Sequence, residues 1–196
     1  GITLRGIVTC IRHFGPDKAR ETALCAAETM GDFVTGFGMA GAELVGRPRD
    51  FAWSFDLARE AGLRLTCHAG EWGGPDMVAD TLRDLRPERI GHGVNAIRDL
   101  ALVDRLAEQG VVLEVCPGSN VFLGAATRTW TGHPIERLRD RGVKVTVSTD
   151  DPPFFGITMT SDYENLERTF GWDQEVFAAV NKVALDAAQA AVQGRG

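Results

Sequence analysis

The sequence predicts an α/β fold built on a parallel sheet, and within that class a (β/α)8 barrel of the TIM type with about six β/α units present. Short apolar runs alternate with helical stretches at a spacing of about 25–30 residues, which is typical of parallel strands joined by helical crossovers. The runs are apolar nearly throughout, as expected of strands buried on both faces. An open doubly wound sheet is the competing architecture. It is disfavoured because Gly36, Gly38 and Gly41 do not open a helix as a dinucleotide-binding turn requires.

The elements follow one another in a regular order. The predicted strands are residues 4–13, 34–40, 64–69, 89–92, 111–115 and 143–148. The predicted helices are residues 16–30, 48–61, 75–85, 97–109, 133–141, 161–170 and 173–192. Pro16 suits a first helical turn, and Gly62, Gly110 and Gly142 are expected C-terminal caps. We treat residues 1–196 as a single incomplete barrel domain, with the Ala- and Gln-rich residues 187–196 as a candidate non-native tail.

Composition excludes several classes of protein. The chain has 196 residues, 44% of them hydrophobic and 24% charged, which is ordinary for a globular domain. Its net charge of −6 argues against binding to nucleic acid, which needs basic patches. No apolar run approaches the roughly 20 residues of a membrane span. The four cysteines form no CxxC pair, so we expect reduced thiols in a cytoplasmic protein.

Ionisable residues gather where the predicted strands end. His13, His68 and His92 each close a strand, and the sixth strand runs into Asp150. In a β/α barrel the carboxyl ends of the strands form the active face, so this placement predicts a functional site. His68 and Glu71 have the spacing of a helical metal pair, but the glycines around them favour a strand end followed by a turn.

Asp150 and Asp151 are adjacent carboxylates that follow an apolar strand. Two such groups repel each other and are tolerated when a cation neutralises one of them, so a zinc ligand is expected here. The alternative is a pair of helix N-cap residues, which Pro152 would permit. His13 is as consistent with a supporting role as with a catalytic one, and His133 with a structural or supporting role.

These residues lie in a set of motifs that resembles the adenosine deaminase family of zinc purine aminohydrolases. The motifs occur in family order and cover most of the chain: 39–43 (MAGAE), 68–71 (HAGE), 89–93 (RIGHG), 113–120 (LEVCPGSN) and 148–152 (STDDP). The other zinc deaminase signature, with H-x-E and P-C-x-x-C, is absent from the sequence. The resemblance implies a mononuclear zinc barrel that replaces the 6-amino group of a small-molecule purine, nucleoside or base, with oxygen.

Roles can be carried over by position from the resemblance. His68 and Asp150 would be zinc ligands, and Glu71 would give a proton to the ring nitrogen beside the reacting carbon. His92 would orient and deprotonate the attacking water, or stabilise the developing charge. The resemblance also assigns purine contacts, one to the Asp151 carboxylate and one to the Gly41 backbone N–H.

One departure from the family pattern concerns the metal. The family's first strand carries a His-x-His pair that completes the zinc site, and this sequence has none. The recognisable part corresponds to the family's strands three to eight, so we expect a piece of a longer enzyme that has little activity alone. Gly91 before His92 favours adenosine over adenine as substrate by analogy, and Ala42 departs from the Asp of many members. The alternatives are an adenine or modified-adenosine deaminase and a metal-free purine-binding module.

Overall fold

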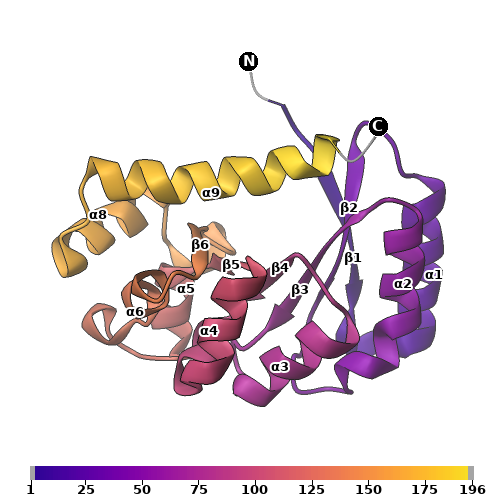
Figure 1. The fold of residues 1–196 in the computed structure, drawn as a ribbon, viewed down its shortest axis with the longest axis horizontal. Helices are drawn as coiled ribbons and strands as arrows, with labels where there is room; N and C mark the ends of the chain where they lie inside the picture. The colour runs from indigo at the N-terminus through magenta and orange to yellow at the C-terminus, as the bar shows by residue number, and fades with distance from the viewer. Residues whose placement is uncertain (1–2, 194–196) are drawn as a thin grey trace.

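The computed structural model describes residues 3–193, apart from the side chains of 189–193. Its centre is one sheet of six parallel strands (Figure 1). The strands are β1 (Gly6–Ile11), β2 (Val34–Ala40), β3 (Arg64–Ala69), β4 (Arg89–His92), β5 (Val112–Val115) and β6 (Lys144–Val147). Their order in the sheet is their order in the chain, β1 to β6. A doubly wound sheet reverses direction at a switch point, so this order identifies the wall of a barrel and confirms the predicted fold class.

Helices follow the strands as predicted. They are α1 (Gly15–Glu28), α2 (Ala52–Glu60), α3 (Pro75–Asp84), α4 (Leu100–Gln109), α5 (Pro117–Leu123), α6 (Ile135–Asp140), α7 (Pro152–Phe155), α8 (Met159–Phe170) and α9 (Gln174–Gln193). The structure adds α5 and α7, which the sequence did not predict because 7 and 4 residues are too few to show a helical period. It also splits the helix predicted at 97–109: a 3-10 turn ends before Asp99, whose carboxylate caps α4.

The two faces of the sheet differ in chemistry. Toward the helices, alternate strand residues such as Leu65, Cys67 and Leu113 are fully buried in two apolar clusters. On the other face Glu114 of β5 accepts hydrogen bonds from Thr66 Oγ1 (2.6 Å) and Arg89 Nη1 (2.6 Å). The inner face is therefore partly polar, whereas the sequence predicted strands that are apolar on both sides. Among the described residues the four cysteines form no disulfide.

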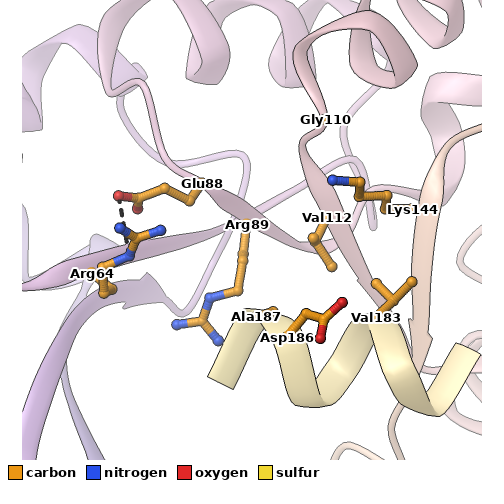
Figure 2. A pocket seen from close by; sticks show the side chains of 9 residues that line it. All are labelled: Arg64, Glu88, Arg89, Gly110, Val112, Lys144, Val183, Asp186 and Ala187. Atoms are coloured by element: carbon orange, nitrogen blue, oxygen red, sulfur yellow. Dashed lines mark ion pairs between the residues drawn. The ribbon is translucent and has the colours of Figure 1, made fainter. Parts of the chain in front are cut away.

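The last helix crosses the sheet. α9 packs on β6 and also contacts β2, and Figure 1 shows it running from α8 toward β1 and β2. Between α9 and the amino ends of the strands lies a pocket of about 220 Å³, lined by charged residues of both signs (Figure 2). Arg64 Nε and Glu88 Oε1 form an ion pair there at 3.5 Å. This end of a barrel contributes to stability, whereas active sites lie at the other end. No helix within residues 3–193 is both long and apolar enough to cross a membrane.

Candidate active site

The predicted site residues converge at the carboxyl end of the sheet. A pocket of about 450 Å³ opens there between β3, β4 and the segment after β6. His68 lies near the end of β3, His92 ends β4, and Asp150 follows β6. The pocket is lined by His68, Gly91, His92, Glu114, Cys116, Ser148, Thr149, Asp150 and Met159.

His92 is at the centre of this group. Its Nε2 lies 3.6 Å from Glu71 Oε2 and 3.9 Å from Asp150 Oδ2, and its ring meets the His68 ring edge-on with centroids 5.0 Å apart. The side chain of His92 is only 2% exposed, and those of Glu71 and Asp150 are 13% and 22% exposed. Four ionisable groups from three crossovers thus share one small, partly desolvated volume.

The backbone is unusual at two of these residues. His92 has φ of 62° and Asp150 has φ of 61°, both in the left-handed region that non-glycine residues rarely occupy. Such conformations persist where the surroundings impose them, and they concentrate at functional sites. Next to His92, a Cβ on Gly91 would lie 2.9 Å from His68 Nδ1. The glycine therefore leaves room for the His68 imidazole against β4.

A buried carboxylate that the sequence analysis left without a role holds the turn after β3. Glu43 is 3% exposed, and its two oxygens accept hydrogen bonds from the backbone N–H groups of Gly70, Glu71 (3.0 Å) and Trp72 (2.8 Å). Asn95 Nδ2 donates to the Glu71 carbonyl oxygen at 2.7 Å. These bonds direct the Glu71 side chain toward His92. The only signal in the sequence was an acidic residue inside one of the quoted motifs.

The pKa values of Glu71 and His92 are shifted in opposite directions. Burial, followed by the nearby charges of Asp150 and Glu43, raises the pKa of Glu71 to about 7. Burial and the neighbouring His68 lower the pKa of His92 below its usual value, because both disfavour a second proton on the ring. At neutral pH the site therefore contains a carboxyl group able to give a proton and a neutral imidazole.

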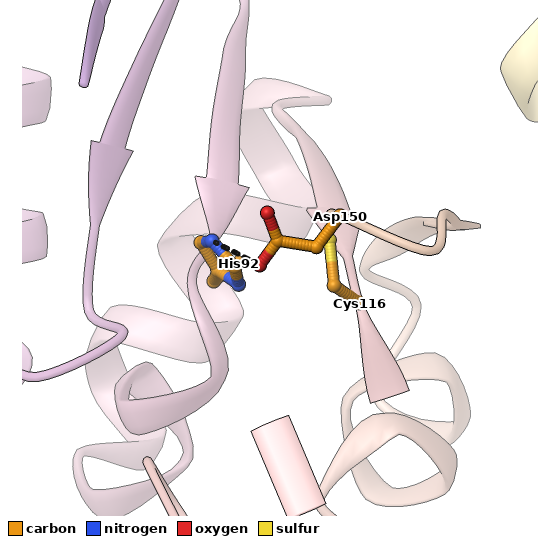
Figure 3. A group of neighbouring side chains, drawn as sticks. All are labelled: His92, Cys116 and Asp150. Atoms are coloured by element: carbon orange, nitrogen blue, oxygen red, sulfur yellow. Dashed lines mark ion pairs between the residues drawn. The ribbon is translucent and has the colours of Figure 1, made fainter. Parts of the chain in front are cut away.

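Within the described residues, Asp150, His92 and Cys116 bring possible metal-ligating atoms close together. One ligand atom from each lies within 4.8 Å of the others, and Figure 3 shows the Asp150 carboxylate directed at His92. Asp150 Oδ2 accepts a hydrogen bond from Ser119 Oγ at 2.7 Å. Burial and the surrounding carboxylates hold the pKa of Cys116 well above its usual value. His68 Nδ1 is buried and has no hydrogen-bond partner among the described residues.

Two predicted purine contacts lie further out. Gly41 follows β2 with φ of 95° and is exposed, and the next backbone N–H, that of Ala42, donates to His13 Nδ1 at 3.2 Å. Asp151 is exposed at the start of α7, and its carboxylate accepts no capping hydrogen bond there. Of the N-cap alternative, the structure thus has the position, which Asp151 occupies, but not the capping hydrogen bond.

Comparison with known proteins identifies the family. The family model described as Adenosine deaminase matches residues 1–195. The chain belongs to the adenosine deaminase family. An adenine deaminase from Rhizobium johnstonii is 50% identical over 188 residues, covering 96% of this chain and 58% of that protein. The chain thus spans less than two thirds of the length of that relative.

Solved structures agree with the family assignment. The crystal structure of adenine deaminase from Arthrobacter aurescens matches with a TM-score of 0.85 and 31% identity, over 92% of this chain and 55% of that one. A cog1816 amidohydrolase from Burkholderia ambifaria, solved with bound Zn, matches with a TM-score of 0.84 and 28% identity, over 93% of this chain and 51% of that one. The fold of this chain therefore matches about half of each of these two proteins.

Proposed function

We propose that the complete protein catalyses hydrolytic deamination of a 6-aminopurine: water adds at C6, the C6–N bond breaks, and the amino group leaves as ammonia. The convergence of Glu71, His92 and Asp150 at the carboxyl end of the sheet carries this proposal. Adenine is the first substrate to test, because the relative that is 50% identical is an adenine deaminase. The preference for adenosine inferred from Gly91 stays a prediction.

Glu71 and His92 are the proposed catalytic residues. Glu71 donates a proton to the ring nitrogen beside C6, which makes that carbon more electrophilic. Its pKa of about 7 supports this role, because an acid must hold its proton at the pH at which it works. His92 faces the same volume through Nε2 and acts on the attacking water.

His68 and Asp150 are the residues that would hold zinc. An imidazole nitrogen and a carboxylate oxygen are ligand types that zinc takes in catalytic sites. The unpartnered Nδ1 of His68 and the free Oδ1 of Asp150, which accepts no hydrogen bond from the described residues, support the assignment. When bound, zinc would supply a nucleophile at neutral pH by lowering the pKa of water to about 7. Asp151 and the Gly41 N–H would contact the purine ring.

The test is hydrolysis at C6 by the complete protein with zinc added, followed as ammonia release from adenine and adenosine and as release of the substituted amine from an N6-modified adenosine. We expect turnover of at least one of them, with adenine converted to hypoxanthine. Purine binding without ammonia release would support a binding module instead, and neither binding nor turnover would overturn the proposal.

The 196-residue chain alone is a second arm of this test. We expect it to bind zinc more weakly than the complete protein and to show little or no turnover, because two protein ligands do not complete a tetrahedral site. Turnover by this chain at stoichiometric zinc would contradict that expectation. The measurements are zinc content after dialysis and the ammonia assay on both proteins.

A further inference from the structure

A row of three buried polar side chains leads away from His92. Asn120 Nδ2 lies 3.1 Å from His92 Nδ1, and Asn120 Oδ1 lies 3.3 Å from His133 Nε2. His92 and His133 are each 2% exposed, and Asn120 is fully buried. Asn120 comes from α5, a helix too short to be visible in the sequence, and His133 lies two residues before the start of α6. The row therefore joins two connections, the one after β4 and the one between β5 and β6.

The far end of the row sets the direction of every hydrogen bond in it. The N–H of Ile135, the first residue of α6, donates to His133 Nδ1 at 3.2 Å. A nitrogen that accepts a hydrogen bond carries no proton, so the proton of His133 is on Nε2. Burial also lowers the pKa of His133 to about 3, which is consistent with a neutral ring.

The proton on His133 Nε2 also fixes the orientation of the Asn120 side-chain amide. Because His133 Nε2 donates, the atom of Asn120 that faces it must be the carbonyl oxygen, and the opposite orientation would place two donors against each other. The amide nitrogen of Asn120 therefore faces His92 and donates to Nδ1. Nδ1 of His92 then has no proton of its own, and a neutral His92 carries its proton on Nε2.

We propose that Asn120 and His133 are positioning residues that fix the tautomer of His92, so that its Nε2–H points at the volume shared with Glu71 and Asp150. The tautomer itself follows from hydrogen-bond directions alone, and only its catalytic consequence rests on the proposed function. A protonated Nε2 donates a hydrogen bond and neither takes a proton from water nor binds a metal. His92 could either deprotonate the attacking water or stabilise the developing charge. A proton on Nε2 favours the second role, and a metal ion would then be held by other side chains of the site.

The direct test is the tautomer of His92 in the complete protein at neutral pH. Long-range ¹H–¹⁵N correlation spectra of protein labelled at histidine distinguish Nε2–H from Nδ1–H, and a His92→Gln sample assigns the signal. We expect Nε2–H. A signal typical of Nδ1–H would overturn the proposal whatever the activity of the protein.

Asn120→Asp is the matched variant, because a carboxylate has nearly the same shape but accepts at both ends. It should still accept from His133 and should move the His92 proton to Nδ1. We expect kcat to fall by about 100-fold, the scale of losing one donor to a developing charge, with KM little changed. An unchanged tautomer in this variant would overturn the proposal.

Asp99→Ala is the stability control, since it removes the cap of α4 and touches no member of the row. It should lower the melting temperature and leave kcat and the tautomer unchanged. An equal loss of kcat in both variants would reduce Asn120 to a structural role. If no purine releases ammonia but Asn120→Asp inverts the tautomer, the proposed function fails and the positioning inference stands.

Discussion

At the scale of residues, burial reverses the usual order of two neighbouring pKa values, those of Glu71 and His92. Glu71 and His92 face each other at 3.6 Å, beyond a good hydrogen bond, and burial acts on them in opposite directions because one gains charge on losing a proton and the other on gaining one. Both groups are therefore neutral at pH values above the lowered pKa of His92 and below about 7, the pKa of Glu71.

Glu71→Gln should abolish turnover while zinc stays bound, since an amide cannot give the proton; a loss of at least about 100-fold in kcat is expected. The folded protein also holds the Glu71 proton more tightly than the unfolded chain, so native stability falls as pH rises from 4.5 through about 7, by on the order of 3 kcal/mol. The variant should lack that decline. Urea unfolding across this pH range, with zinc analysis and the ammonia assay, measures all three quantities.

Glu60→Gln is the control for that variant, because Glu60 is exposed at the end of α2. It should keep both the activity and the pH dependence of the wild type. A Glu71→Gln protein that deaminates at more than a tenth of the wild-type rate would remove Glu71 from the mechanism.

Glu43→Gln should loosen the turn that directs Glu71. Three backbone N–H groups converge on the carboxylate, and an amide offers one acceptor and two more donors in its place. We expect a loss of about 1–3 kcal/mol in the free energy of unfolding and a lower kcat. Denaturant titration and steady-state kinetics beside Glu60→Gln would measure the effect, and equal behaviour of the two variants would argue against the role.

How far individual residues could be predicted depends on the range of their contacts. His68, His92 and Asp150 were predictable as neighbours because each lies at or near the end of a strand or follows it, and parallel strand ends meet at one edge. Their chemical roles stay predictions. Glu43 and Asn120 had no visible role because the backbone partners of Glu43, and His92 as partner of Asn120, are 27 to 29 residues away, in other connections. A single buried carboxylate or amide leaves no repeating pattern in the sequence from which its partner could be predicted.

At the scale of elements, all six strands were predictable from apolar runs, and the helices that failed were the short ones. α5 begins within the motif at 113–120 and α7 within the motif at 148–152. With 7 and 4 residues, they are too short to show a helical period in their apolar residues. The start of α4 was readable in principle, because Asp99 is a favoured N-cap residue. Capping residues thus mark the ends of long helices in the sequence, whereas short helices such as α5 and α7 depend on tertiary contacts.

Gly91→Ala tests the packing of β4 on β3. The new Cβ would lie 2.9 Å from His68 Nδ1, so the imidazole must move. We expect weaker zinc binding by the complete protein and a loss of about 1–3 kcal/mol in stability, the usual effect of overpacking. Gly74→Ala is the matched control, because its Cβ would meet nothing within 4 Å. Competition with a zinc chelator and thermal unfolding compare the two, and equal zinc affinity would refute the close-packing explanation.

At the scale of the whole molecule, the sheet has two outer strands. Within residues 3–193, β1 and β6 each pair with one neighbour only, and Ile7 of β1 is 43% exposed. Unpaired parallel edges with apolar side chains favour pairing with other chains. The α9 helix covers part of β6 but does not close the sheet into a ring.

Ile7→Lys should reduce association of the 196-residue chain, because a charge on an outer strand opposes edge-to-edge pairing. We expect the wild-type chain to sediment as larger species as its concentration rises and the variant to do so less, with similar circular dichroism. Analytical ultracentrifugation over a concentration series measures this. A wild-type chain that stays monomeric throughout would show that its edges are already protected.

The sequential order of the strands also bears on how such a sheet is made. Every strand after the first finds its hydrogen-bonding partner in the strand just synthesised, so each ladder closes a loop of only one crossover. Short loops carry a small entropic penalty, and assembly can advance in step with the ribosome. The group around His92 would then be completed late, because Asp150 follows His68, Glu71 and His92 in the chain.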